Sequence, residues 1–148
     1  MNGGNLRSPT FLKRTAEEAD AAAVQVIRPE TSSSMRYLFH WNGVKGSGRN
    51  ALVPGFDVGG KTGTADKVIN GRYAAHLNFN AFLAGFPIDQ PRYVVLTIID
   101  APLTGEKGGR TAAFTAAPMA KKIIERTASL LGVQPKFGDG EAQFLMNY

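Results

Sequence analysis

The sequence lacks cysteine altogether and holds only two histidines among its 148 residues. Without cysteine, the chain has no disulfide, no thiol nucleophile and no thiolate ligand for a metal ion. His40 and His76 are too few for a zinc site and argue against a Ser-His-Asp triad, so we expect both at or near the surface. The sequence therefore predicts neither a metal site nor a bound cofactor.

The chain also lacks a long hydrophobic run, since no apolar stretch approaches the roughly eighteen residues of a membrane-spanning helix. Runs of like charge are missing as well. The net charge is +5 and the sequence pI is near 9.7, but the basic residues are scattered. Scattered charge is typical of a solvated surface, so we expect no nucleic-acid partner. The length and a hydrophobic content of 43% suit one globular domain.

The most informative segment is Gly59-Gly60-Lys61-Thr62-Gly63-Thr64-Ala65, which supports two interpretations. In the first, a strand ends in Lys-Thr-Gly-Thr, an active-site motif of penicillin-recognising serine enzymes. In the second, Gly55 to Thr62 satisfies the spacing G-x-x-x-x-G-K-[ST] of a phosphate-binding loop. The apolar strand that ends at Asp100 is then similar to the magnesium-binding motif of such proteins.

The phosphate-loop interpretation needs a helix directly after Thr62, because N–H groups at the helix N-terminus hold the phosphates. Gly63 stands where the first helical turn should be, and Asn70-Gly71 marks a turn soon after. Pro54 also interrupts the strand that should precede the loop. These features favour the strand interpretation. A nucleotide-binding protein stays as the alternative, and a non-catalytic interaction module as a third class.

Hydrophobic periodicity and turn residues predict an α+β chain. Short turns at Asn70-Gly71 and at 89–92 indicate a three-stranded antiparallel meander, with a C-terminal helix packed on it. We assign Trp41, Phe79, Phe82 and Phe86 to the core. The expected elements are a short strand at 10–13, a loop or helical turn at 15–23, a partner strand at 23–27, an amphipathic helix at 32–43 with N-cap hydroxyls from Thr31 to Ser34, strands near 56–66, 76–87 and 92–100, a helix near 113–131, and a tail at 136–148.

Several short segments, in this order, match one known family. They are Asn2-Gly3-Gly4 followed by Pro9-Thr10, Glu30-Thr31-Ser32, Gly46-Ser47-Gly48 with Ala51, Val58 through Ala65, Phe82 through Pro87, Tyr93 through Pro102, and Thr115 through Pro118. The chain resembles the C-terminal part of a class B penicillin-binding protein of the cell-division type, a D,D-transpeptidase that cross-links peptidoglycan through an acyl-serine intermediate. The resemblance covers residues 1–135 and implies the C-terminal portion of a penicillin-binding-protein/β-lactamase-like transpeptidase fold.

Two motifs of this family are missing from the chain. It contains no Ser-x-x-Lys, which carries the nucleophile in the family, and no Ser-x-Asn; Ser33 to Arg36 has the first spacing but ends in arginine. In the family both motifs precede the Asn-Gly-Gly turn. We therefore expect residues 1–135 to be a C-terminal fragment of the transpeptidase domain. Such a fragment would be inactive alone and would lack the membrane anchor of its parent.

The resemblance also implies roles for the lysine motif. Lys61 would assist the nucleophile electrostatically and help to bind the terminal carboxylate of the substrate. The hydroxyls of Thr62 and Thr64 would bind that carboxylate, or the one on a β-lactam. The backbone N–H of Thr64 would form half of the oxyanion hole, and Gly63 would let the substrate lie antiparallel to the strand. The implied catalytic residues are thus Lys61 and Thr64, and the implied substrate-binding residues are Thr62, Gly63 and Thr64.

The implied partners are peptidoglycan stem peptides, β-lactams and the missing N-terminal part of the domain. The implied location is the periplasmic face of the bacterial inner membrane. In the family fold the strand at 93–99 is central, but without its outer neighbour it would be an edge. It carries no charge between Arg92 and Asp100, and such an edge readily pairs with another chain. We therefore expect the chain to self-associate.

Overall fold

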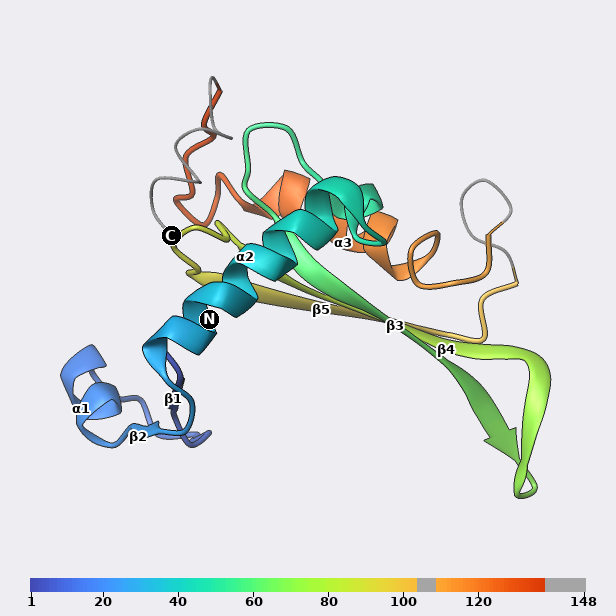
Figure 1. The fold of residues 1–148 in the computed structure, drawn as a ribbon, viewed down its shortest axis with the longest axis horizontal. Coiled ribbons are helices and arrows are strands. Elements are labelled where there is room, and N and C mark those ends of the chain that lie inside the picture. Colours follow the sequence, from blue (N-terminus) through green and yellow to red (C-terminus); the bar gives the residue numbers. More distant parts are fainter. Residues whose placement is uncertain (104–108, 138–148) are drawn as a thin grey trace.

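A computed structural model describes residues 1–103 and 109–137 (Figure 1). Its middle part forms three long strands, β3 (Gly59–Ile69), β4 (Arg72–Phe86) and β5 (Tyr93–Asp100). They pair antiparallel in the order β3-β4-β5, as short connections between consecutive strands favour. The predicted meander is confirmed. The first two strands extend further toward their shared turn than the sequence pattern indicated.

The hairpin between β3 and β4 turns at Asn70-Gly71, where both residues have positive φ, of 50° and 75°. A type I′ hairpin turn requires this backbone conformation at both central residues. Pairing with β4 is regular up to Asp66 and shifts at a bulge between Asp66 and Val68. The tip of the hairpin extends well beyond the rest of the sheet (Figure 1). The Lys-Thr-Gly-Thr segment lies before the bulge, in the regular part of the ladder.

One face of the sheet, here called the α3 face, is covered by α3 (Ala116–Thr127), and the 3-10 turn η1 (Arg49–Ala51) packs against α3. Alternate residues of a strand point to the same face, and Phe82, Ala84 and Phe86 of β4 are fully buried there. The predicted packing of the C-terminal helix is confirmed, although the helix ends before Leu130, which is exposed. The core consists of Ala51, Val53, Val58, Phe82, Ala84, Phe86, Ala112, Ala116, Ala117, Ala120, Ile124, Ala128 and Val133.

Helix α2 (Pro29–Lys45) is longer than predicted at both ends. It begins at Pro29. Proline suits the first helical position, because a backbone N–H there would have no hydrogen-bond partner within the helix. The expected N-cap from Thr31 to Ser34 is therefore wrong, since these residues lie inside the helix. The expected apolar stripe is wrong as well, because Ser32 is buried while Leu38 is exposed.

Helix α2 crosses the opposite face of the sheet, the α2 face, at the start of β3 (Figure 1). Glycines allow this close approach. A Cβ at Gly43 would lie 2.6 Å from the carbonyl oxygen of Val58, and one at Gly59 would lie 2.9 Å from the backbone carbon of Phe39. Both distances are too short for a real side chain, so the helix and the strand fit only without one. The predicted contact between this helix and the sheet is confirmed.

Beyond α2, Met1 and Ile88 contact the α2 face at Gly85, where an added Cβ would lie 2.9 Å from Met1 Sδ and 3.4 Å from Ile88 Cδ1. No other described helix packs on this face. The core assignments of Phe82 and Phe86 are confirmed, and Trp41 is half-buried. The core assignment of Phe79 is wrong, because alternation along β4 places it on the open face. The apolar residues exposed on this face are Leu77, Phe79, Leu83, Val94, Leu96 and Ile98.

Most of the first 28 residues form a small unit beside the start of α2, away from the large sheet (Figure 1). Met1 is the exception, since a Cβ at Gly85 of β4 would lie 2.9 Å from its Sδ. In it β1 (Asn5–Leu6) pairs antiparallel with β2 (Val24–Gln25). Between them, α1 (Ala16–Ala21) starts with a capping box made by Thr15 and Glu18. The helical turn is confirmed. The strand predicted at 23–27 is present only at Val24–Gln25 and pairs with β1 rather than with residues 10–13, where the predicted strand is wrong. Phe11 is fully exposed there, and nothing in the segment pairs with a neighbour.

Among the helices of residues 1–103 and 109–137, none combines the length and the apolar composition needed to cross a bilayer. Residues 138–148, which make up most of the predicted tail, lie outside the described ranges.

Candidate active site on strand β3

The Lys-Thr-Gly-Thr residues lie in the first half of β3, which continues as a strand to Ile69. A phosphate-binding loop would need a helix after Thr62, so the nucleotide interpretation is wrong. The physical reason is local: threonine favours strands and glycine disfavours helices. Asp100, the residue considered for magnesium, instead forms an ion pair with Lys67 at 2.7 Å.

In the described residues β3 is an edge strand with β4 on one side only. The carbonyl oxygen of Gly60 accepts a hydrogen bond from Asn42 Nδ2 of α2 (2.7 Å), so it points away from β4. Lys61 Nζ reaches the carbonyl oxygen of Thr62 at the same edge (2.7 Å). Backbone groups alternate in direction along a strand, so the N–H and C=O of Thr64 also point outward. This edge can pair with an added extended chain.

The two threonine side chains share one face of β3, and each hydroxyl has a neighbour. Thr62 Oγ1 lies 2.8 Å from Ser47 Oγ, in the loop after α2. Thr64 Oγ1 accepts a hydrogen bond from the N–H of Ala112 (3.0 Å). A hydroxyl that accepts one hydrogen bond can still donate its proton. Thr64 is exposed, so it can direct that proton toward an anionic group at the strand edge.

Gly63 differs from the glycines that precede it. A Cβ at Gly60 would lie 2.3 Å from the carbonyl oxygen of Leu83, so packing against β4 requires glycine at that position. A Cβ at Gly63 would meet its nearest neighbour, Ala81 Cβ, at 3.9 Å, which is ordinary contact. Nothing in the described chain requires a glycine at position 63. Because Gly63 has no side chain, the space beside β3 at this position stays free for a ligand.

Two residues that organise this site were not predicted from the sequence. Asn42 accepts a hydrogen bond from the N–H of Ser47 through Oδ1 (3.2 Å) and donates to Gly60 through Nδ2 (2.7 Å). One amide side chain therefore holds both the loop after α2 and the start of β3. Ser47 contributed to the family match, but it lies 15 residues before Thr62, and no spacing rule connects them.

A charged cluster supports the loop that leads into β3. Lys136 Nζ lies 2.6 Å from Asp89 Oδ2 and 3.9 Å from Asp57 Oδ2. Burial, and next the nearby Asp89, raise the pKa of Asp57. The hydrogen bond to Asp89 raises the pKa of Lys136. The N–H of Lys136 also donates to the carbonyl oxygen of Gly55 (2.7 Å), so the segment after α3 holds residues 55–57 in place.

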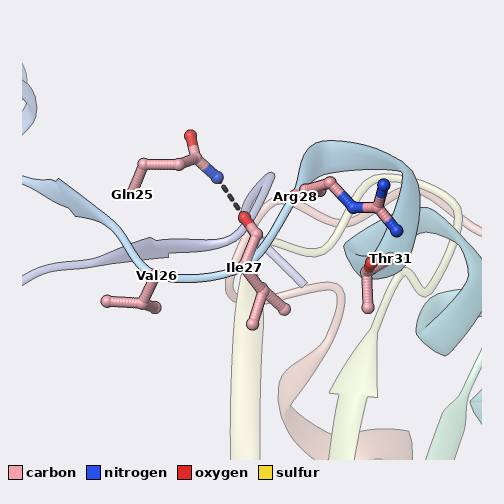
Figure 2. Close-up of a pocket in the computed structure, with 5 residues that line it drawn as sticks. All are labelled: Gln25, Val26, Ile27, Arg28 and Thr31. Atoms are coloured by element: carbon pink, nitrogen blue, oxygen red, sulfur yellow. Dashed lines mark hydrogen bonds between the residues drawn. The ribbon is translucent and has the colours of Figure 1, made fainter.

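A separate hollow of about 400 Å³ lies where β2 runs into α2, and Figure 2 shows the residues that line it. Within it the side chain of Gln25 donates to the carbonyl oxygen of Ile27. Its only ionisable lining residue is Arg28, so no acid–base pair is available there. The described residues also contain no group of three or more metal-ligating side chains. The open edge of β3 is therefore the better candidate for a functional site.

A comparison with protein families identifies the fold. Residues 1–125 match the model of the penicillin-binding protein transpeptidase domain. The chain belongs to this family. The match runs through the small N-terminal unit, α2, the three-stranded sheet and most of α3.

Similar curated proteins include Stage V sporulation protein D of Bacillus subtilis, which is 35% identical over 99% of this chain and 24% of the relative. They also include the probable peptidoglycan D,D-transpeptidase FtsI of Caulobacter vibrioides, 37% identical over 92% of this chain and 25% of the relative. The chain thus spans about a quarter of the length of these two relatives.

Solved structures show the same fold. The transpeptidase domain of penicillin-binding protein 3 from Burkholderia pseudomallei is 30% identical, with a TM-score of 0.77 over 92% of this chain and 40% of that chain. Penicillin-binding protein 3 of Mycobacterium tuberculosis, in complex with ampicillin, is 25% identical, with a TM-score of 0.67 over 80% of this chain and 28% of that chain.

Proposed function

We propose that β3 is the lysine-motif strand of a peptidoglycan D,D-transpeptidase site. The open outer edge at Thr62–Thr64 carries this proposal. The described chain does not require a glycine at position 63, and the missing side chain leaves room for a ligand. An extended peptide that ends in a carboxylate would add to this edge as a further strand. The named relatives that act on peptidoglycan support the same substrate class.

In this proposal the side chains bind the carboxylate of the substrate. Lys61 supplies a positive charge at an exposed position, where the hydrogen bond from its Nζ to Thr62 O keeps the ammonium group at the strand edge. The hydroxyls of Thr62 and Thr64 donate to the carboxylate oxygens. Charge-assisted hydrogen bonds of this kind are about twice as strong as neutral ones. A β-lactam carries a comparable carboxylate, and the mycobacterial neighbour is described in complex with ampicillin.

The backbone of Thr64 has the catalytic role. Its N–H points to the outer edge, where it would donate to the oxyanion that forms when a serine attacks the substrate carbonyl. One such donor is worth about 3 kcal/mol in comparable acyl-transfer sites. Because the N–H belongs to a paired strand, its direction is set before the substrate arrives.

The covalent step needs a serine that this sequence does not supply in a recognisable motif, since it contains neither Ser-x-x-Lys nor Ser-x-Asn. We therefore propose that the chain binds carboxylate ligands but does not acylate by itself. Acylation would require the remaining part of a transpeptidase domain, at the periplasmic face of the inner membrane.

The test is an NMR titration of the isotope-labelled chain with a peptide that ends in D-alanyl-D-alanine. We expect weak binding, with Kd on the order of millimolar, and amide shifts confined to residues 60–64. The Gly63→Ala variant should fold normally, because its Cβ has space, yet it should lose these shifts. Ligand shifts that map elsewhere, such as around Arg28, would contradict the proposal.

The controls separate folding from binding. Gly60→Ala should disturb the fold, because its Cβ would clash with Leu83. ATP should cause no shifts in this segment. With a fluorescent penicillin, the chain should show no stoichiometric covalent band on a denaturing gel. Such a band would show that the chain holds its own nucleophile.

A further inference from the structure

We propose that Asn80 of β4 is a positioning residue for Thr64. It fixes the segment 110–115, in which the N–H of Ala112 binds the Thr64 oxygen and leaves the Thr64 proton free for a ligand. This inference rests on the proposed function, because it concerns the same carboxylate site on β3. It adds a residue that lies outside the lysine motif and acts only through Thr64.

Asn80 is a buried polar residue in an otherwise apolar row. It alternates along β4 with Phe82 and Ala84 on the α3 face, and all three residues are 0% exposed. Burying an amide costs free energy unless its polar atoms form hydrogen bonds. The reason for a polar side chain at this position therefore lies in what it binds.

The amide nitrogen of Asn80 binds both ends of one short segment. Nδ2 donates to the carbonyl oxygen of Arg110 (2.6 Å) and to Oγ1 of Thr115 (2.8 Å). The Thr115 hydroxyl donates its own proton to the carbonyl oxygen of Thr111 (3.0 Å), so it accepts from Asn80. Because both partners are acceptors, the orientation of the amide is fixed. Oδ1 is buried without a hydrogen-bond partner among the described residues, so the amide acts through Nδ2 alone.

Thr64 is the residue of β3 that this segment contacts. It lies directly opposite Asn80 in the ladder between β3 and β4. Its Oγ1 accepts a hydrogen bond from the N–H of Ala112 (3.0 Å), which stands between the two anchored residues. A backbone N–H can only donate, so the Thr64 oxygen is an acceptor here and its proton must go to another group. Since Thr64 is exposed, a carboxylate at the strand edge can take that proton's hydrogen bond. A hydroxyl without the Ala112 contact would have to be ordered by the ligand, at a cost in affinity.

Two other hydrogen bonds hold the chain just after this point, and one of them provides a control. Asn50 Nδ2 donates to the carbonyl oxygen of Ala113 (2.7 Å), and Thr97 Oγ1 donates to that of Ala116 (2.8 Å). Thr97→Val removes a buried hydrogen bond next to the segment but leaves both bonds of Asn80 in place. It should therefore weaken the fold without releasing Ala112.

The first test needs no ligand. Amide hydrogen exchange of the full chain, followed by NMR, reports how firmly the N–H of Ala112 is held. Asn80→Ala should speed exchange at Ala112 about tenfold relative to Thr97→Val. Thr115→Val should speed it as well, whereas Thr115→Ser, which keeps the hydroxyl, should not. Equal exchange in Asn80→Ala and Thr97→Val, or in the two Thr115 variants, would overturn the proposal.

The second test is the Kd of the peptide that ends in D-alanyl-D-alanine, measured from the amide shifts of residues 60–64. Asn80→Ala should weaken binding about threefold, and Thr97→Val should leave the Kd unchanged. In a chain that already carries Thr64→Val, Asn80→Ala should have no further effect, because the hydroxyl through which it acts is gone. If Asn80→Ala does not fold, Thr115→Val replaces it in both tests.

The outcomes separate this role from the site itself. If the natural chain does not bind the peptide at residues 60–64, the proposed function fails and the role of Asn80 fails with it. If the natural chain binds there but Asn80→Ala leaves the Kd unchanged, only the role of Asn80 is overturned, and the residue is an anchor for the fold alone. The same threefold loss with and without the Thr64 hydroxyl would also overturn it.

Discussion

The two faces of the central sheet are built from the same strands but differ in how deeply their side chains are buried. On the α3 face, Phe82 and Ala84 are fully buried, and Thr97 is 5% exposed. On the α2 face, Leu83 is 41% exposed and Leu96 is 56% exposed. These residues alternate along β4 and β5, and those on the open face are at least as apolar as those on the covered one. Hydrophobicity alone therefore does not decide which face is buried.

The difference comes from the helices. Helix α3 offers Ala116, Ala117 and Ala120 to the sheet, and these small residues allow close packing along β4 and β5. Helix α2 comes closest to the other face at the start of β3, beside Gly59. Burial on the α3 face therefore follows the packing of α3, while the described residues leave much of the α2 face exposed.

The largest effect is expected from truncating neighbouring residues on opposite faces. Phe82→Ala should destabilise the chain by about 3–5 kcal/mol, because it leaves a cavity in the core. Leu83→Ala should cost about 1 kcal/mol or less, since the side chain already lies partly in water. Urea unfolding followed by circular dichroism compares the two. Equal losses would show that the α2 face is buried in solution.

A smaller effect is expected from a buried hydrogen bond on the α3 face. Thr97 Oγ1 donates to the carbonyl oxygen of Ala116 (2.8 Å) and connects β5 to the start of α3. Thr97→Val keeps the shape but removes the donor, so it should cost about 1 kcal/mol. The adjacent Ile98→Val, on the open face, should cost about 0.5 kcal/mol or less. Thermal melts of the two variants measure this, and Thr97→Val should have the lower melting temperature. If Ile98→Val melts lower instead, the hydrogen bond contributes less to stability than this contact indicates.

The smallest effect concerns pH and the segment that closes the α3 face. Val133 is buried in the core, and Lys136 follows it to reach Asp57 and Asp89. Because the folded state raises the pKa of Asp57, the folded chain binds that proton more tightly than the unfolded chain. Above the folded-state pKa, the charged Asp57 therefore lowers the free energy of unfolding. This loss of stability disappears as the pH falls through the folded-state pKa toward the pKa of the unfolded chain.

Asp57→Asn should remove this dependence. At pH 7 the variant should be more stable than the natural chain, because it carries no charge that burial disfavours. The advantage should shrink as the pH approaches 4. Thermal melts at both pH values measure it, with Glu125→Gln as the exposed control. A variant that is less stable at pH 7 would show that the attraction to Lys136 outweighs burial.

Whether each predicted helix or strand was correct depended on a few neighbouring residues. The meander followed from Asn70-Gly71 and from alternation, both of which depend on a few neighbouring residues. The start of α2 was missed because Pro29 reads equally well as the end of a strand and as a first helical residue. The strand at 10–13 was wrong because strand propensity without a partner does not form a ladder.

By itself the sequence determined the family, the antiparallel order of the strands and the strand that carries Lys61 to Thr64. These depend on short motifs and on periodicity, which neighbouring residues carry. Only the tertiary structure decided which edge of β3 is open, that Asn42 and Ser47 hold it, and that Phe79 faces outward while Phe82 is buried. Such features arise from contacts between residues far apart in the chain, and no local pattern encodes where the helices pack.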